Sequence, residues 1–483
     1  MNFNFWRQYV TPQVAVFCGS LLLSLISYFG VATIGKDGAF YVDIAQTIAD
    51  HGIAAGVARF HWIGFPLLLA ALHKITSLPI EGLAYVVCAL FMAGTCTLLV
   101  DVVVRGFRKS AWWAVLVVLA IPALNEFRSD IIREHGFWFF SVLSLWLAMD
   151  WFERGKWWVA VAIQFSIAAA AIFRLEALLL EGVFALWLLP GLRTRLGWLR
   201  IVQFYWLPML VAAFLLSSVS IMNWRRVQYF MGMLNPVQMH SDFQLLASQF
   251  SDSLRYKYSR DEAGVIVFFG VCGLVLVKFL KLLGPFVLPL LTREGFAGVV
   301  VALSRYRTFI LAFMAYVFVL LLFFFHEQFL NSRYVSFLNI MAVPFVVVAT
   351  SFFSERYRYF GRVVLILGVL VMLGGVISLS PKKTHYIEAG HWMAGHYEKT
   401  NAVFYDDPRI GYYAGWGYPD GQMRSVRDLN EKALREYLLF VLEVEPDEPW
   451  LQEWLDRNNL VRIAIFDNNA GDFVQIFTRK DGL

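Results

Sequence analysis

Charged residues are scarce in this sequence of 483 residues. Asp, Glu, Lys and Arg make up 16% of the chain, whereas 59% of it is hydrophobic. Soluble domains carry about 25% charged and about 45–50% apolar residues. The apolar residues also run on for about 20 positions at a time, the length of a helix that crosses a bilayer. The scarcity of charge excludes an ordinary soluble protein and indicates a chain that spans a membrane many times.

Cysteine is also rare, and the apolar runs contain all four: Cys18, Cys88, Cys96 and Cys272. None has the spacing to histidine or to another cysteine that a metal site requires, so neither a disulfide framework nor a zinc site is indicated. The net charge of +5 does not imply a nucleic-acid partner. Membrane proteins carry Lys and Arg in cytoplasmic loops as a topological signal.

The first apolar run, at 14–34, is too long for a signal-peptide core and lacks a convincing cleavage site, so we predict a retained membrane span. Similar runs recur along the chain and predict about eleven spans in all. The further runs lie at 82–104, 111–124, 136–152, 157–173, 175–190, 201–222, 263–283, 308–326, 334–352 and 363–379.

Basic residues gather in alternate connections between these spans. By the positive-inside rule those connections are cytoplasmic, the N-terminus is inside, and an odd number of spans puts the tail outside. The predicted outer loops are then 35–81, 125–135, 223–262 and 326–333. The basic residues that carry this signal are Arg105, Arg108, Lys109, Arg154, Lys156, Arg193, Arg195, Arg200, Arg293, Arg305, Arg307, Arg356, Arg358 and Arg362.

The composition changes abruptly near residue 380. We predict a polytopic α-helical membrane domain over 1–380 and a small extracytoplasmic α/β domain of about a hundred residues over 381–483. Its turn-rich stretch DDPRIGYYAGWGYPDG begins at Asp406. A helix is predicted around 430–442, and VRIAIFD at 461–467 is predicted to be a buried strand.

Polar chemistry begins in the first predicted outer loop, IGKDGAFYVDIAQTIADHG at 34–52. Leaving the first span, the chain places Asp37 close to the predicted bilayer surface. Apolar residues such as Ile44 and Ile48 recur at helical spacing, which predicts an amphipathic helix on the interface. A carboxylate would thereby be held at the lipid boundary. The alternative is that Asp37 only caps this helix.

Basic residues that the topology signal does not require also lie on the predicted outer side, several at or inside a span end. A charge there costs roughly 3 kcal/mol unless it is compensated. Guanidinium groups match phosphate oxygens bidentately, and a lipid phosphate would lie at this depth. Alternatively, these side chains snorkel to headgroups or pair with Glu126, Glu134, Glu176 and Glu327. They are Lys36, Arg59, Arg128, Arg133, Arg174, Arg225, Arg226 and Arg333.

Four stretches, in the same order along the chain, resemble motifs of the GT-C superfamily of membrane glycosyltransferases. The branch is that of the dolichyl-phosphate-mannose protein mannosyltransferases and the bacterial lipid A aminoarabinose transferase. KDGAFYVDIAQ is similar to the first-loop motif, and FRSDIIREHGFWFF to the second outer loop. FRLEALLL is similar to the Arg-x-Glu start of the next span, and HEQFLNSRYVSFLNIMAVPF to the Arg-Tyr motif before a Pro-containing helix. The tail resembles the small outer domain of that branch.

The resemblance implies transfer of a sugar from a polyprenyl-phosphate donor, of undecaprenyl or dolichyl type, to an acceptor hydroxyl or amine with inversion. Asp37 would be the catalytic base, and Asp130 would position the acceptor or ligate a divalent cation. Arg333 would hold the lipid phosphate. Further candidates for phosphate binding are Arg59, Arg128, Arg133 and Arg174. The matching motifs also make Tyr41, Asp43, Glu176 and Tyr334 candidate substrate-binding residues.

Two positions depart from the pattern of the family. Gly38 stands where many relatives carry a second acid, so any role of that acid would pass to Asp43 or Asp130. Leu175 stands where a proline often precedes the glutamate of the Arg-x-Glu motif, here Glu176. The outer histidines His61, His135 and His326 are expected to form hydrogen bonds rather than to bind a metal.

The predicted protein is therefore a hexosyl or pentosyl transferase of the bacterial inner membrane, with its active site and tail facing the periplasm. Its partners would be the lipid-linked sugar, a lipid, glycan or protein acceptor, and membrane lipids. No metal ligands are assigned, and a divalent cation is left open. The alternative is a transporter or a lipid-linked-sugar flippase. Transporters, however, place polar residues near mid-membrane on broken helices, whereas here these residues gather at one face.

Overall fold

The computed structural model describes residues 11–216, 228, 232, 235–378, 380–400, 402–419, 425–429 and 431–480. Arg225 and Arg226 lie outside the described residues. The chain divides into two compact units, and each is described by itself. The first unit comprises Met1–Ser24, Ala89–Arg128 and Arg133–Val376, and the second comprises Leu25–Cys88, Ser129–Ile132 and Ile377–Leu483. The predicted domain boundary at residue 380 stays a prediction.

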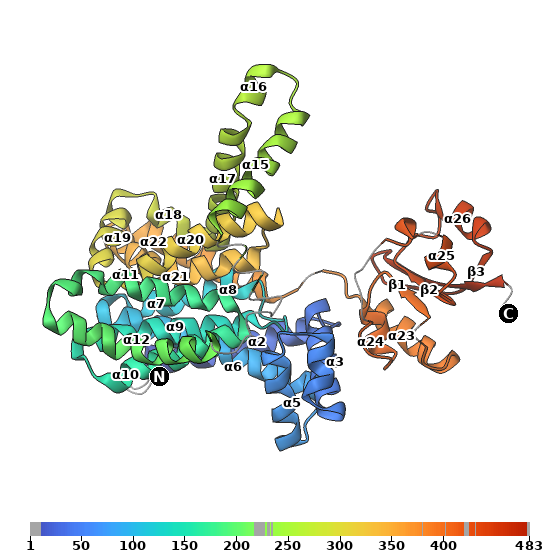
Figure 1. Cartoon of the computed structure of the whole chain (residues 1–483), viewed down its shortest axis with the longest axis horizontal. Helices are drawn as coiled ribbons and strands as arrows, with labels where there is room; N and C mark the ends of the chain where they lie inside the picture. Colours follow the sequence, from blue (N-terminus) through green and yellow to red (C-terminus); the bar gives the residue numbers. More distant parts are fainter. Residues whose placement is uncertain are drawn as a thin grey trace. The chain divides into compact units, whose positions relative to one another are not determined.

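Long apolar helices dominate the structure (Figure 1). Among the described residues, 8 helical segments are long and apolar enough to cross a membrane. Among the described residues, most of each predicted span is helical, which confirms a polytopic helical membrane protein. These 8 segments are α2 Pro12–Gly30, α6 Ile80–Gly106, Leu175–Arg193 with α11 Leu179–Leu188 at its centre, α12 Arg195–Leu216, Ala263–Leu290 beginning with α17 Ala263–Leu283, α20 Arg307–Glu327, α21 Ser332–Arg356 and α22 Arg358–Val376.

The remaining predicted spans are shorter or less apolar helices. They are α7 Ala111–Ala120 with α8 Pro122–Asn125, α9 Glu134–Arg154 and α10 Trp157–Phe173.

Helix α21 forms the centre of the first unit. Of its apolar window 94% is buried inside the protein, against 22% for α22 and 33% for α20. It contacts α7, α8, α17, α20, α22 and the amphipathic helix α19 Arg293–Arg305. Gly298 allows α19 to approach closely, because a Cβ atom there would lie 3.1 Å from the carbonyl oxygen of Val348. The residues at the start of α21 are therefore fixed by the best-packed helix of the unit.

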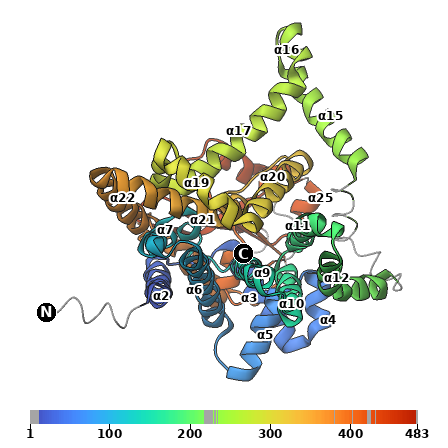
Figure 2. The same ribbon diagram turned by 90° about the vertical axis from the view of Figure 1, so that its left-hand side faces the viewer.

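The predicted outer loop 223–262 contains helices that the sequence pattern did not predict. Helix α15 Pro236–Ser253 and helix α16 Lys257–Asp261 lead into α17, and both views show this hairpin extending from the other helices of the first unit (Figures 1 and 2). The His326 Nδ1 atom lies 2.8 Å from Asp242 Oδ2, which ties α15 to the end of α20.

The first outer loop folds as three helices of the second unit: α3 Lys36–His51, α4 Ile53–Arg59 and α5 Gly64–Thr76. The predicted amphipathic helix is confirmed by α3, which buries Ile44 and Ile48. Gly52 joins α3 to α4 with a φ of 88°, a conformation that residues with a Cβ atom rarely adopt. The chain can therefore turn sharply between these two helices.

The tail folds around a 4-stranded sheet in the order β1-β2-β4-β3. The strands are β1 Val403–Tyr405, β2 Leu439–Leu442, β3 Leu460–Asp467 and β4 Phe473–Arg479. Strands β1 and β2 are parallel, whereas the other two pairs are antiparallel. Helix α23 Thr384–His396 packs against β3 and β4. The predicted α/β character of the tail is confirmed.

Two details of the tail prediction were wrong. The segment 430–442 was predicted as a helix, but only α25 Glu431–Leu434 is helical and 439–442 is the buried strand β2. Leu439–Leu442 is fully buried between β1 and β4, and this tertiary pairing overrides the local helical pattern. The strand predicted at 461–467 exists as β3, but it is an edge strand, and Ile465 is 43% exposed.

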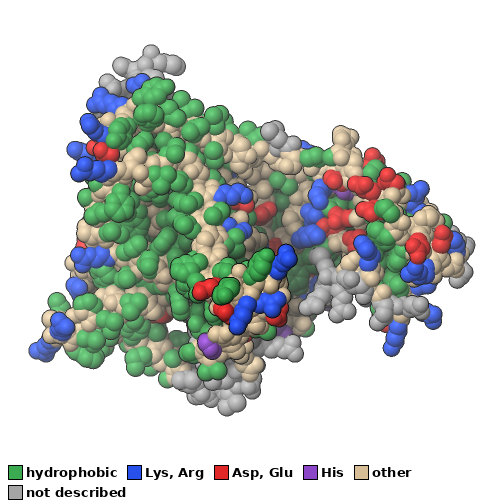
Figure 3. Space-filling view, turned by 90° about the horizontal axis from the view of Figure 1, so that it is seen from above, with side chains coloured by type: hydrophobic (Ala, Val, Ile, Leu, Met, Phe, Trp, Pro, Cys, Tyr) green, Lys and Arg blue, Asp and Glu red, His purple; other side chains and the backbone are tan. Residues whose placement is uncertain are grey.

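Surface chemistry differs between the helical part and the tail. Apolar side chains cover most of the visible face of the long helices, whereas acidic and basic side chains gather over the tail (Figure 3). A broad apolar surface on helices is typical of a protein that faces lipid. The chain is therefore an integral membrane protein with a polar C-terminal domain.

The orientation across the membrane is tested with two exposed residues, Lys109 and Lys432. Each is replaced by cysteine in a background without the native cysteines. A membrane-impermeant maleimide should label Lys432→Cys in intact spheroplasts, and should label Lys109→Cys only after lysis, because basic loops remain cytoplasmic. The reverse pattern would contradict the predicted orientation.

Candidate functional site

The predicted site residues fall into two groups, one in each unit. The second unit contains the candidates of the first outer loop together with Asp130. The first unit contains Arg128, Arg133, Arg174, Glu176, Arg333 and Tyr334. Each group is described within its own unit.

Asp37 lies in the first turn of α3. The N-cap residue of this helix is Gly35, and no side chain forms a capping hydrogen bond there. The alternative that Asp37 serves as the N-cap is therefore wrong. A carboxylate in the first turn still interacts favourably with the positive end of the helix dipole.

Asp130 lies beside the same end of α3. A Cβ atom built on Gly35 would be 3.6 Å from Asp130 Oδ1. The structure therefore brings the two predicted catalytic carboxylates, Asp37 and Asp130, to one end of a single helix. Sequence distance hides this proximity, because helices α4 to α8 lie between the two residues along the chain.

Gly38 is explained by the packing of residues 129–132 against α3. A Cβ atom on Gly38 would lie 3.0 Å from the Ile131 Cβ atom and 3.0 Å from the Ile34 Cγ1 atom. Both neighbours belong to segments with little room to move, and Ile34 and Ile131 are 2% and 1% exposed. A larger side chain at position 38 would therefore have to displace Ile131 or Ile34.

Tyr41 and Asp43 are held by contacts within the second unit. Tyr41 is 7% exposed, and its ring makes an edge contact with Phe65 at 5.6 Å between centroids. Arg59 Nη1 donates to Asp43 Oδ2 at 2.7 Å, and Arg59 Nη2 donates to the carbonyl oxygen of Tyr418 at 2.8 Å. Arg59 thus binds the tail and α3 together, and its role in phosphate binding stays a prediction.

Arg174 is the centre of the group in the first unit. It follows α10 directly, is 6% exposed, and donates through Nη1 to Glu134 Oε1 at 2.6 Å. Its Nη2 atom donates to Glu176 in the adjoining 3-10 turn η2 Leu175–Leu178. Both terminal nitrogens therefore bind carboxylates, which agrees with the alternative that outer arginines pair with neighbouring glutamates.

Arg333 and Tyr334 approach this pair from the first turn of α21. Arg333 Nε lies 3.6 Å from Glu134 Oε1, and the Arg333 side chain is 23% exposed. The ring of Tyr334 lies 4.5 Å from the Arg174 Cζ atom and 5.4 Å from the Arg333 Cζ atom, within cation–π range. Three sequence motifs thus meet in one cluster, with Arg133 at the N-cap of α9 next to Glu134.

Arg128 lies apart from this cluster. Its guanidinium is 5% exposed and donates to Asn125 Oδ1, to Ser20 Oγ and to Ser24 Oγ. These partners come from α2 and α8, so Arg128 fastens the first helix to the start of the second predicted outer loop. Its role in donor binding stays a prediction.

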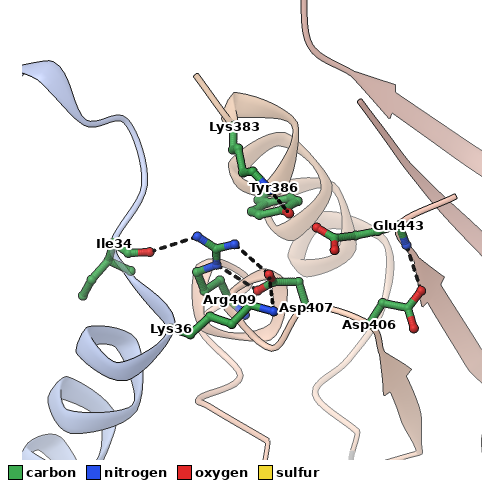
Figure 4. Close-up of polar contacts among 8 residues, drawn as sticks. All are labelled: Ile34, Lys36, Lys383, Tyr386, Asp406, Asp407, Arg409 and Glu443. Atoms are coloured by element: carbon green, nitrogen blue, oxygen red, sulfur yellow. Dashed lines mark hydrogen bonds and ion pairs between the residues drawn. The ribbon is translucent and has the colours of Figure 1, made fainter. Parts of the chain in front are cut away.

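Sequence reasoning missed an ion cluster in the second unit (Figure 4). Lys36 Nζ lies 3.1 Å from Asp407 Oδ2, and Arg409 Nη2 donates to the same oxygen at 2.7 Å. Burial favours a higher pKa for Asp407, but the hydrogen bonds and charge of Arg409, with Lys36 nearby, hold that pKa below its usual value. Burial raises the pKa of the adjacent Asp406 to about 6. The Asp-x-Arg spacing in DDPR could have indicated this ion cluster from the sequence.

A metal site receives no direct support from side-chain geometry. Among the described residues, no group of three or more His, Cys, Asp or Glu side chains is arranged to hold a metal ion. A divalent cation held by fewer protein ligands, with Asp37 and Asp130 as the nearest candidates, stays an expectation.

The chain shares its fold, in which long apolar helices are followed by a small C-terminal sheet, with a solved structure. The solved structure of ArnT from Cupriavidus metallidurans in the apo state matches 96% of this chain and 97% of its own, with a TM-score of 0.61 at 12% identity. ArnT is a lipid A aminoarabinose transferase. No protein-family model and no curated protein matches the sequence. The resemblance inferred from the four motifs is therefore confirmed at the level of the fold.

The packing around Gly38 predicts that a larger side chain there destabilises the protein. Gly38→Asp should lower the free energy of unfolding by about 1–3 kcal/mol, because a new side chain must displace Ile131 or Ile34. Thermal unfolding in detergent measures the change. Gly82→Ala is the matched control, since a Cβ atom on this exposed helical glycine of the same unit meets nothing within 4 Å. Equal stability of Gly38→Asp and wild type would contradict the packing argument.

Proposed function

We propose that this protein is a glycosyltransferase that moves a sugar from a polyprenyl-phosphate donor to an acceptor on the extracytoplasmic face of the membrane. The observation that carries the proposal is the ArnT-like fold over 96% of the chain. The acceptor is a lipid, a lipopolysaccharide glycan or a protein. The host membrane is a bacterial inner membrane, with the site facing the periplasm.

The reaction needs a base that removes a proton from the acceptor as it attacks the anomeric carbon. Asp37 fits this role, because its carboxylate lies in the first turn of a helix that follows the first span and belongs to the motif KDGAFY. The acceptor oxygen or nitrogen forms a bond to the anomeric carbon, and the bond from that carbon to the phosphate oxygen breaks. Attack from the opposite face of the sugar gives inversion.

The departing polyprenyl phosphate needs cations that stabilise its growing negative charge. Arg333 is the strongest candidate, because it is the more exposed of the two arginines that flank Glu134. Arg174 is already bound to two carboxylates. Its role is therefore to hold Glu134 and the ring of Tyr334 in position rather than to bind the phosphate directly.

Asp130 is a second carboxylate near the start of α3. It positions the acceptor through a hydrogen bond, or it shares a divalent cation with Asp37. These two roles are separated by the metal dependence of transfer. Loss of transfer in a chelator with recovery in Mg²⁺ or Mn²⁺ supports the cation, and unchanged transfer in the chelator supports direct positioning.

The donor is identified from the polyprenyl-phosphate sugar that accumulates in cells from which the protein has been removed. The same lipid, purified, then serves as donor for the protein in detergent or liposomes. Transfer by the wild-type protein supports the proposal. Accumulation of no lipid-linked sugar, together with no transfer in vitro, would overturn it and favour transport.

Asp37→Asn should abolish turnover while the protein stays folded. The substitution keeps the shape of the side chain but removes the proton acceptor, and loss of a general base costs about 10²–10⁴ in rate. Single-turnover transfer, donor binding and thermal stability are measured in parallel. Asp50→Asn is the matched control, because Asp50 lies on the exposed far end of the same helix. Near-normal transfer by Asp37→Asn would move the base to Asp43 or Asp130.

Arg333→Lys should weaken donor use, and Arg333→Ala should weaken it further. Lysine keeps the charge but loses the bidentate fork that matches a phosphate. A charge-assisted hydrogen bond contributes about 1.5–3 kcal/mol, so we expect the donor KM to rise by roughly tenfold or more. Arg305→Ala provides a control, since Arg305 pairs with Glu153 elsewhere in the first unit. Unchanged donor KM in both Arg333 variants would place the phosphate site elsewhere.

A further inference from the structure

One face of α3 is covered by the tail. Lys36, Phe40 and Asp43 follow the i, i+4, i+7 spacing that aligns side chains on a helix. Lys36 binds Asp407, and Phe40 makes an edge contact with the ring of Tyr418 at 5.3 Å between centroids. The stripe runs beside Asp37. The tail therefore contacts the helix next to the proposed base along its first two turns.

The tail approaches Asp43 closely at a position where a residue other than glycine would be strained. A Cβ atom on Gly417 would lie 2.9 Å from Asp43 Oδ1, and Gly417 has a φ of 91°. Arg59 links the two partners, because it donates to Asp43 and to the carbonyl oxygen of Tyr418. This contact determines how closely the tail loop approaches α3.

The backbone just before α3 is bound on both of its polar groups. The Ile34 N–H group donates to the Tyr413 hydroxyl oxygen at 2.8 Å, and Arg409 Nη1 donates to the Ile34 carbonyl oxygen at 3.4 Å. Both partners belong to α24 Arg409–Tyr413 in the tail. Asp37 is three positions further along the chain, so the tail holds the segment from which the proposed base projects.

Asp407 is the junction of these contacts (Figure 4). Its side chain is 1% exposed, whereas that of Lys36 is 43% exposed. Arg409 donates to it through Nε and Nη2, and Arg409 reaches Ile34 through Nη1. Exposed ion pairs contribute little, but a buried carboxylate that loses a cationic partner is costly. The buried carboxylate of Asp407 therefore favours one arrangement of Lys36 and Arg409 around it.

The tail does not need these contacts for its own core. Its apolar core is built from α23, α24 and the sheet, with Tyr386, Met393, Val441 and Ile476 among its buried members. Lys36 and Ile34 contribute nothing to that core. A substitution of Lys36 should consequently remove a contact between α3 and the tail without disturbing the folding of the tail.

We propose that segment 406–418 of the tail is a positioning element for Asp37, with Asp407 and Arg409 as the positioning residues. The inference rests on the proposed function, because it concerns the base of that reaction. The small outer domain is then part of the catalytic apparatus: it holds the start of α3 in the position from which Asp37 reaches the acceptor. Tyr418 lies close enough that the Asp37 charge adds to the effect of burial, and together they raise the pKa of Tyr418 to about 12.

The test compares Lys36→Met, Asp407→Asn and their double variant in the full-length protein. Steady-state transfer at varied donor concentration uses the lipid-linked sugar that accumulates in cells without the protein. We expect Asp407→Asn to lower kcat by about tenfold to a hundredfold with little change in donor KM, because misplacement of a catalytic group by about 1 Å has effects of this size. Lys36→Met should also lower kcat, whereas Lys36→Arg, which keeps the positive charge, should retain the kcat of wild type. The double variant should be no worse than Asp407→Asn alone.

Two control variants exclude a simple loss of tail stability. Ile476→Val weakens the core of the tail without touching α3, and Glu453→Gln removes an exposed ion pair on α26 Leu451–Arg457. Both should keep kcat near that of wild type. If Ile476→Val lowers kcat as far as Asp407→Asn at equal loss of melting temperature, the positioning proposal is overturned. Multiplicative effects of Lys36→Met and Asp407→Asn would also overturn it.

Amide hydrogen exchange gives a readout that does not depend on the reaction. Asp407→Asn should speed exchange over 34–43 relative to wild type, whereas Ile476→Val should speed it mainly within the sheet. If wild type transfers no sugar, the proposed function fails, and exchange still decides whether the tail orders α3. Unchanged exchange over 34–43 in Asp407→Asn would contradict the positioning role even in an active enzyme.

Discussion

Compensation of buried charge is the constraint on which both polar clusters depend. Glu134 and Arg174 are 3% and 6% exposed, and both lie where a long helix begins or ends. An unpaired charge at such a depth costs several kcal/mol, so each group holds the other in place. The first turn of α21 then adds Arg333 and Tyr334 to a site whose geometry is already fixed.

In the second unit, compensation of a buried charge links α3 to the tail. Asp407 is buried between Lys36 and Arg409, and these two cations belong to α3 and to the tail. The carboxylate therefore joins two segments that are far apart in sequence. A neutral side chain could pack at this position, but it could not specify the position of both partners at once. Directional ion pairs and hydrogen bonds do specify it.

Each of the two clusters contains an arginine that holds carboxylates in place. Arg174 and Arg409 each bind carboxylates through more than one nitrogen, which is typical of residues that hold a structure together. Asp37 and Arg333 carry the proposed chemistry. Arg174 shares Glu134 with Arg333, and Arg409 binds the backbone of Ile34 just before Asp37. Preorganised sites require supporting groups that hold the reacting groups in position.

Much of the fold follows from the sequence alone. The apolar runs determine the membrane helices because a helix is the way a single segment satisfies its backbone hydrogen bonds in lipid. The amphipathic pattern after Asp37 likewise determines α3, and four short motifs were sufficient to indicate the fold that this chain shares with ArnT. Each of these features depends on residues close together in the chain.

Tertiary structure decided the features that depend on distant residues. Residues 439–442 form a strand because β1 and β4 supply partners on both sides, which no local pattern records. Ile131 leaves little room for a side chain at Gly38. Asp407 pairs with Lys36, from which most of the sequence separates it. Composition and periodicity report which residues are apolar or charged. Only the folded chain determines which charges meet, because electrostatic partners are selected by distance in space rather than by position in sequence.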